Sequence, residues 1–189
     1  MNNQERSITS IDVKKTTLGT VLAVIAAVAL PQLLHVIGAA TGLGTMPGET
    51  FLPMHLPVLL CGFFAGPVAG VLAGALSPAI SAALTGMPLP AMLPFMTIEL
   101  AGYGLAAGCI RNTYGTSDHM MIKVLAAQAF GRAIRAIAIL IAFYGLGLKM
   151  IAPPVIWNSI IAGIPGIAIQ LAVIPAAVYA VRKMQESER

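Results

Sequence analysis

The chain has 189 residues, of which 58% are hydrophobic and only 10% are charged. Residues 16–110 include just two charged side chains, Glu49 and Glu99, and a soluble domain could not expose that much apolar chain without solubilising charge. The formal net charge of +4 comes from basic residues near the ends of the apolar stretches, which indicates membrane topology rather than a nucleic-acid surface.

The composition predicts an all-α integral membrane protein. A span needs roughly 20 apolar residues, so the chain has room for a bundle of six transmembrane helices, and no stretch shows the alternation of a β-barrel strand. The predicted spans, bounded by turn residues, are 17–39, 51–65, 67–84, 91–110, 121–146 and 155–181. The membrane domain is therefore expected at 17–181, between an N-terminal segment at 1–16 and a tail at 182–189.

Basic residues predict the orientation of the bundle. They are Arg6, Lys14 and Lys15 before the first span, Arg111 and Lys123 beside the fourth connection, and Arg182, Lys183 and Arg189 after the sixth span. With six spans these eight lie on one side, and the opposite connections hold only Lys149. The positive-inside rule then places both termini in the cytoplasm. The first apolar stretch has no cleavage-site pattern and is expected to remain as a helix.

Two polar stripes lie inside predicted spans. Gln128, Arg132 and Arg135 follow one face of the fifth helix, and Glu99 and Tyr103 follow one face of the fourth. A charge near the bilayer centre costs at least ~2.5 kcal/mol, so these groups require a partner or a wet cavity. One interpretation is a Glu99–Arg135 ion pair that only locks two helices. We favour a ligand cavity, because two arginines against one glutamate leave a positive site for a carboxylate or phosphate.

Further polar and soft side chains lie near the outer ends of the spans. His55 begins the second predicted helix and Asn158 lies near the start of the sixth; capping bonds and an outward-facing pocket are equally compatible with both. His35 and Trp157 are expected at the membrane interface. Five methionines in or near the outer connections suit either an apolar ligand or ordinary packing: Met46, Met54, Met87, Met92 and Met96.

Small residues at four-residue spacing allow helices to approach closely. Gly70 and Gly74 in the third span predict packing inside the bundle. For Ala23 and Ala27 in the first span, internal packing and contact with another subunit are equally expected.

No enzymatic signature appears in the chain. It has no Walker A sequence, no His-Glu-x-x-His, no Gly-x-Ser-x-Gly and no metal-spaced cysteine and histidine cluster. Cys61 and Cys109 fall inside predicted spans and are interpreted as small packing residues. The sequence therefore predicts no ATP hydrolysis, no other enzymatic activity, no cofactor and no metal ion.

A series of short motifs resembles a known family. In chain order they are Phe-Leu-Pro-Met-His-Leu-Pro-Val-Leu-Leu-Cys-Gly-Phe at 51–63, Gly66-Pro67-x-x-Gly70, Ser77-Pro78, Ser81, Thr85-Gly-Met-Pro88, Glu99-Leu-x-x-Tyr-Gly104 and Gly131-Arg132. Together with the length and the six spans, they are similar to the substrate-binding S components of energy-coupling factor (ECF) vitamin transporters. The resemblance covers most of the chain from the first helix onward.

The resemblance implies a substrate-binding subunit in a prokaryotic cell membrane. Its partners would be a membrane scaffold subunit and two cytoplasmic ATPases, in agreement with the missing Walker motif. The site would lie near the outer face, under the first, third and fifth connections, and the family's Ala-x-x-x-Ala motif for scaffold contact maps onto Ala23 and Ala27. The predicted substrate-binding residues are His55, Glu99, Tyr103, Arg132, Arg135 and Asn158. The arginines favour pantothenate, while cobalamin, a pyridoxine- or pyrimidine-type precursor and folate remain open.

Two other classes of function are compatible with parts of the pattern. A proton-coupled secondary transporter would use Glu99 and His55 as its relay, but single-chain carriers usually need more helices. A non-transporting assembly subunit would use the small-residue faces, but it would not need intramembrane charges.

Overall fold

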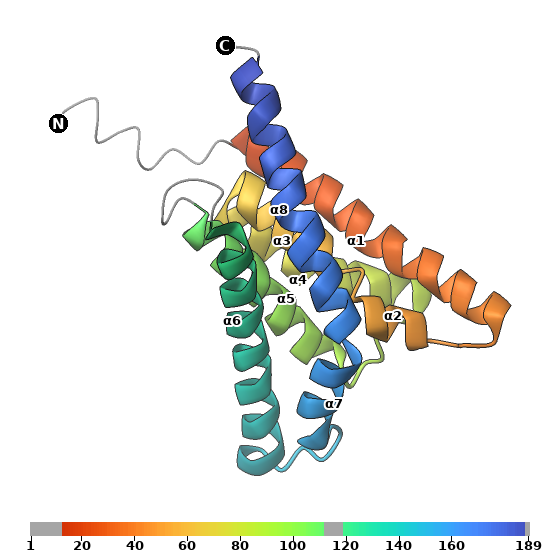
Figure 1. Cartoon of the computed structure of the whole chain (residues 1–189). Helices are drawn as coiled ribbons and strands as arrows, with labels where there is room; N and C mark the ends of the chain where they lie inside the picture. The colour runs from red at the N-terminus through yellow and green to blue at the C-terminus, as the bar shows by residue number, and fades with distance from the viewer. Residues whose placement is uncertain (1–12, 112–118, 188–189) are drawn as a thin grey trace.

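The computed structural model describes residues 13–111 and 119–187, apart from the side chains of residues 182, 185 and 186 (Figure 1). The described residues contain helices and no strand, and six helical segments are long and apolar enough to cross a membrane. The predicted fold class is confirmed. The predicted connection at 112–118 and the basic residues Arg6 and Arg189 lie outside the described residues.

The helices follow the predicted spans with a few differences. In chain order they are α1 (Val13–Thr41), α2 (Met46–Phe51), α3 (His55–Ala65), α4 (Pro67–Thr85), α5 (Leu93–Ile110), α6 (Met120–Leu140), the π-helical turn η3 (Ile141–Gly145), α7 (Pro154–Ala162) and α8 (Ile164–Ser187). The second crossing, Met46–Ala65, combines α2 and α3. The helix thus starts earlier than predicted and is interrupted at Leu52, which adopts a left-handed conformation with φ 48°.

The prediction of one continuous sixth span at 155–181 is wrong. The chain forms two helices there, separated at Gly163, and the segment that can cross the membrane is Ile164–Val181. Pro165 favours the break, because it has no N–H to donate to the carbonyl four residues earlier and fits best in the first turn of a helix. As a result, α7 is a separate short helix at the end of the bundle.

The helices α1, α3, α4 and α5 form the compact half of the molecule. A Cβ atom on Gly70 would overlap the backbone of Gly104, and one on Gly74 would overlap the backbone of Leu100. Helices α4 and α5 therefore touch backbone to backbone, as small-residue faces in membranes permit. The prediction that Gly70 and Gly74 pack inside the bundle is confirmed.

The helices α6, α7 and α8 form the open half. Helix α6 packs on α5 but meets α8 over a much smaller surface, and α7 has no buried residue. A polar chain joins the parts: Gln128 Nε2 of α6 donates to Gln170 Oε1 of α8 at 2.8 Å, and Gln170 Nε2 donates to the Leu52 carbonyl at 3.3 Å. This chain holds α8 against the interruption between α2 and α3.

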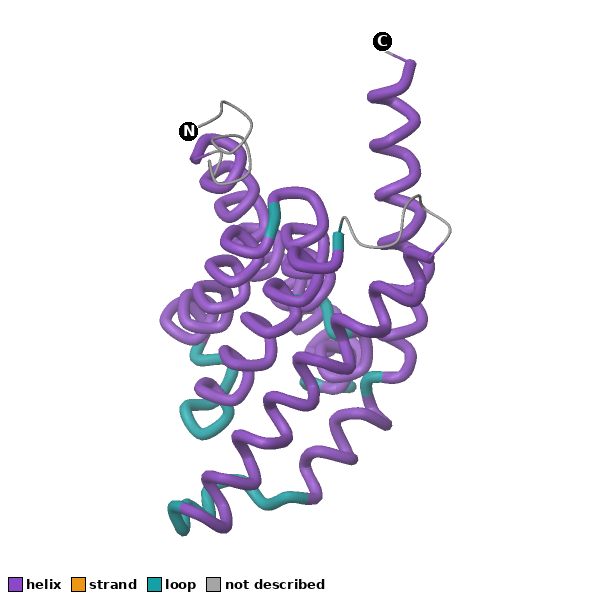
Figure 2. Tube along the Cα trace, turned by 90° about the vertical axis from the view of Figure 1, so that its left-hand side faces the viewer, coloured by secondary structure: helices purple, strands orange, loops and turns teal. Residues whose placement is uncertain are grey.

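The start of α1 and the end of α8 lie at the same end of the bundle, as Figures 1 and 2 both show. The α1–α2 and α6–α7 connections lie toward the opposite end. This arrangement is what six crossings require. That the end with the start of α1 faces the cytoplasm remains a prediction from the basic residues.

Candidate solute-binding site

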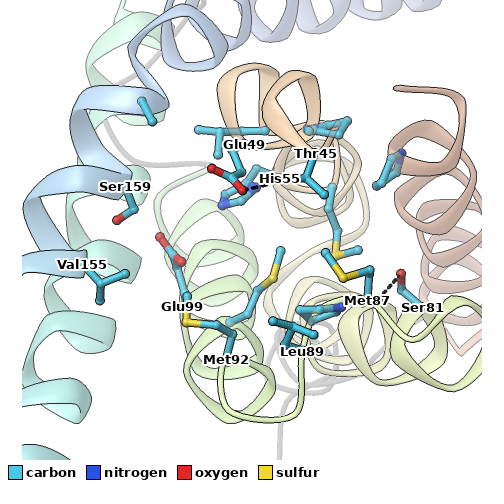
Figure 3. A pocket seen from close by; sticks show the side chains of 18 of the residues that line it. Thr45, Glu49, His55, Ser81, Met87, Leu89, Met92, Glu99, Val155 and Ser159 are labelled. Atoms are coloured by element: carbon cyan, nitrogen blue, oxygen red, sulfur yellow. Dashed lines mark hydrogen bonds between the residues drawn. The ribbon is translucent and has the colours of Figure 1, made fainter. Parts of the chain in front are cut away.

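A cavity of about 490 Å³ opens between the helix ends opposite the start of α1. Its lining comes from the end of α1, from α2, from the α2–α3 interruption, from the α4–α5 connection and from α5, α6 and α7. Most of the lining is apolar, with a few polar groups (Figure 3). This size and character are typical of pockets for small organic molecules.

One ion pair fixes the polar wall of the cavity. Arg135 Nη1 on α6 lies 2.9 Å from Glu99 Oε2 on α5, and the Tyr103 hydroxyl donates to Glu99 Oε1 at 2.7 Å. Glu99 and Tyr103 are each 1% exposed. Both carboxylate oxygens of Glu99 are thus occupied, so the predicted helix-locking pair exists. Tyr103 orients Glu99 through its hydroxyl hydrogen bond and is not part of the cavity lining.

Arg132 lies one turn before Arg135 and also lines the cavity. Its Nε is buried without a hydrogen-bond partner, and no carboxylate among the described residues forms a salt bridge with it. Its Nη2 would lie 3.3 Å from a Cβ atom on Gly163. The glycine between α7 and α8 therefore leaves room for the guanidinium, whose positive charge is not neutralised by the ion pair beside it.

His55 stands at the start of α3, with 5% of its surface exposed. Its ring centroid lies 5.2 Å from that of Tyr103, and its backbone N–H donates to the Leu52 carbonyl at 3.1 Å. Its Nδ1 is buried and has no partner in the described part of the chain. Because His55 also lines the cavity, this nitrogen is available to a ligand or a water molecule.

Of the six predicted binding residues, the structure brings five to the cavity wall: His55, Glu99, Arg132, Arg135 and Asn158. Asn158 is on α7 and is exposed. Trp157 beside it is 68% exposed and does not line the cavity, which is compatible with the expected membrane-interface position.

Sequence reasoning missed the contribution of α2 and of the end of α1. Glu49 and Thr45 line the cavity, and the Thr45 hydroxyl donates to Glu49 Oε1 at 3.2 Å. His35, expected only as an interfacial residue, also lines the cavity and lies close to Gly48. The available signal was charge, because Glu49 is one of just two charged residues in the first ninety-five positions after Lys15.

Sulfur-containing side chains form much of the apolar wall. Met54, Met87, Met92 and Met96 line the cavity, whereas Met46 points elsewhere and is 58% exposed. In Figure 3, Met87, Leu89 and Ser81 lie on one side of the pocket, and Glu99, Val155 and Ser159 lie on the other. Ser81 fixes the α4–α5 connection, because its hydroxyl donates to the Met87 carbonyl at 2.8 Å.

Ala23 and Ala27 are placed in the interior of the chain. They are 7% and 0% exposed, on the face of α1 that packs on α3 and α4. This burial is what internal packing of the isolated chain requires. Contact of these two residues with a scaffold subunit remains a prediction.

The fold and the cavity define a helical, multi-pass membrane protein with a small-molecule-sized pocket at one end of its bundle. The model of the family described as "ECF transporter, substrate-specific component" matches residues 12–178, and the chain belongs to this family. No curated protein and no solved structure gives a significant match.

Membership of this family establishes the general role of the chain. It is the substrate-specific subunit of an ECF transporter, a transporter subunit and not an enzyme. Such components bind small-molecule substrates and work with scaffold and ATPase modules. The proton-coupled carrier and the non-transporting assembly subunit are therefore set aside.

Proposed function

We propose that the 490 Å³ cavity is the substrate site of this S component and that Arg132 binds an anionic group of the solute. The observation that carries the proposal is the guanidinium of Arg132, whose Nε is buried without a partner and which forms no salt bridge with a described carboxylate. The Nε of Arg135 is also buried without a partner, but Arg135 is paired with Glu99 through Nη1. A guanidinium can grip a carboxylate or phosphate through two parallel hydrogen bonds. An anionic solute would neutralise the positive charge of Arg132, which no carboxylate of the described residues neutralises.

The remaining polar residues have different roles in this proposal. Glu99 and Tyr103 hold Arg135, and the pair keeps α5 and α6 in register behind Arg132. His55 and Asn158 offer hydrogen bonds along the wall. The division explains why two arginines occur on one helix face, since one serves the bundle and the other serves the solute.

Cavity size and lining narrow the choice of vitamin. Pantothenate is the first candidate, because it combines one carboxylate with a branched apolar centre that suits the methionine-rich wall. Cobalamin is disfavoured, since its corrin ring and nucleotide loop far exceed a cavity of about 490 Å³. A pyridoxine- or pyrimidine-type precursor and folate stay as alternatives.

The proposal includes the assembly and its place in the cell. The subunit would deliver its solute together with a scaffold subunit and two ATPases in a prokaryotic plasma membrane, with both termini in the cytoplasm. The cavity would then open to the outside, because it lies at the end of the bundle opposite the start of α1. An outward opening is what solute capture for import requires.

Mass spectrometry of small molecules retained by the purified protein would identify the solute. Calorimetric titration of that solute, or of pantothenate, into the protein in nanodiscs would then test Arg132→Gln. Loss of a charge-assisted hydrogen bond is expected to weaken binding about ten- to a hundredfold, and Arg132→Lys should also weaken it, because an ammonium cannot form the fork.

The matched control is Lys183→Gln, which removes a positive charge from an exposed position near the end of α8, away from the cavity. It should bind like the parent protein. Unchanged affinity in Arg132→Gln would show that the solute does not use this guanidinium and would overturn the proposal.

A further inference from the structure

The four charged residues that line the cavity carry two positive and two negative charges, but only two of these residues form an ion pair with each other. Glu49, Glu99, Arg132 and Arg135 all line it, so their formal charges sum to zero. Glu99 and Arg135 neutralise each other through their ion pair. What the cavity offers to a solute is therefore one unpaired cation, Arg132, and one unpaired anion, Glu49.

Glu49 is held in place but not neutralised. It lies in the first turn of α2, and among the described residues its carboxylate accepts one hydrogen bond, from the Thr45 hydroxyl at 3.2 Å. No cation among the described residues forms a salt bridge with it. A carboxylate accepts about four hydrogen bonds, so Glu49 keeps free acceptor positions beside Thr45 and His55, where Figure 3 shows it.

Most of the rest of the lining is apolar. Met92 and Leu89 stand below Glu49 in Figure 3, and Met54 and Met96 contribute further thioethers. Such side chains adapt to apolar groups of many shapes. A solute that filled the cavity would contact this apolar wall as well as both charges.

We propose that the captured solute is bifunctional: one anionic group binds Arg132, a hydroxyl, amide or ammonium donor binds Glu49, and the apolar part lies against the methionines. This inference rests on the proposed function, since it assumes that the cavity is the substrate site. It adds a rule of selection, because a second anionic group in the solute would meet the unpaired carboxylate of Glu49.

The rule separates the remaining vitamins. Pantothenate satisfies it, with a single carboxylate and two hydroxyl donors. Folate carries two carboxylates and is disfavoured. A neutral pyridoxine- or pyrimidine-type precursor would satisfy Glu49 but would leave Arg132 without an anion. Glu49 thus acts as a specificity-determining residue that selects against dianions.

A panel of straight-chain acids tests the rule without knowledge of the natural solute. The probes are hexanoate, 6-hydroxyhexanoate, 6-aminohexanoate and adipate, which share one carboxylate and differ at the far end. Their affinities for the purified full-length chain in nanodiscs are measured by calorimetry, with pantothenate beside them. The hydroxy and amino acids are expected to bind at least about tenfold tighter than adipate, because only they can donate to Glu49.

The variant Glu49→Gln should remove this preference, so that adipate and 6-hydroxyhexanoate bind within about twofold of each other. Since Glu49 is exposed, the variant should fold normally, which an unchanged gel-filtration profile would verify. Thr45→Val should give a smaller change in the same direction. Its control is Thr41→Val, because the Thr41 hydroxyl bonds to the Ile37 carbonyl and does not line the cavity.

Each outcome has one meaning. If the probes bind through Arg132 but adipate binds as tightly as the donor-bearing acids, or if Glu49→Gln keeps the preference, the rule of selection is overturned and the substrate site stands. If no acid binds the parent protein, or if Arg132→Gln binds them all unchanged, the anion contact fails and the rule fails with it.

Discussion

The compact half of the bundle (α1, α3, α4 and α5) and the open half (α6, α7 and α8) hold their helices together by different means. In the compact half, glycines bring backbones into contact, as at Gly70 and Gly104. In the open half, α6, α7 and α8 meet one another over small surfaces, and the bond between Gln128 and Gln170 joins α6 to α8. Toward the other helices, glycines again allow close approach, at Gly131 of α6 and Gly166 of α8, and polar bonds from Arg135 and Gln170 add to this packing.

The difference follows from the solvent. Lipid is as apolar as a leucine side chain, so apolar faces gain little by meeting each other, and helices associate through close van der Waals packing or through polar bonds. Close packing leaves no space for a solute. The cavity forms where close packing ends, along the boundary between the halves, and two of its charged residues, Glu99 and Arg135, form an ion pair across that boundary.

The largest expected effect comes from breaking the ion pair between the halves. Glu99→Gln leaves the guanidinium of Arg135, whose side chain is 11% exposed, without a counter-charge. Removing one partner of a buried pair costs about 3–5 kcal/mol of unfolding free energy, which SDS titration in mixed micelles would measure.

The double variant Glu99→Gln/Arg135→Gln is the control for this effect. It removes both charges and should regain most of the lost stability. If Glu99→Gln alone is as stable as the parent, this ion pair does not stabilise the contact between the two halves.

A bulky residue within α1 tests the compact half. Ala27 is 0% exposed, so Ala27→Trp should overpack the interior, lower the unfolding free energy by about 3 kcal/mol and weaken solute binding by the isolated subunit. Ile25→Trp, at a position 60% exposed on the same helix, is the matched control and should leave binding unchanged. Calorimetry on both variants gives the answer.

The same pair of variants distinguishes the two roles considered for this helix. Normal folding and binding in Ala27→Trp, together with loss of uptake by the whole transporter, would show that this alanine faces the scaffold subunit. The burial of Ala27 in the isolated chain would then not describe the assembled transporter.

Adding one methyl group to a glycine in each half compares how tightly the two halves are packed. Gly70→Ala would place a Cβ atom inside the Gly104 backbone, forcing α4 and α5 apart at a cost of about 2 kcal/mol. Gly145→Ala, in η3 of the open half, would meet just the Ile141 Cγ2 atom at 3.8 Å and should be tolerated. Thermal melting in detergent should show a lower Tm for Gly70→Ala alone; equal melting would remove the distinction between the halves.

The smallest expected effect is loss of the amide bond within the open half. Gln128→Leu removes the donor to Gln170, and interhelical hydrogen bonds in membranes average about 0.6 kcal/mol. Solute affinity should fall slightly more in Gln170→Leu, because Gln170 also bonds to the Leu52 carbonyl at the cavity wall. Equal affinity in both variants would show that the bond to Leu52 does not shape the site.

The sequence by itself determined the fold class, the six spans and the residues that carry unusual chemistry. The reason is energetic: a membrane span needs a long apolar stretch, and each charge inside it requires a partner. Glu99, Arg132 and Arg135 could therefore be picked out without coordinates, as could the candidate ion pair between Glu99 and Arg135.

Only the tertiary structure decided which of these residues pair with each other and which line the cavity. Helices that are apolar on all sides carry no pattern that fixes their rotation, so the sequence could not tell whether Glu99 and Arg135 pair with each other or bind a ligand, or whether Ala27 faces inward. It also could not bring Glu49 of α2 to the same cavity as Arg132 of α6. Those contacts depend on the breaks at Leu52 and Gly163, which direct α2 and α7 over the end of the bundle.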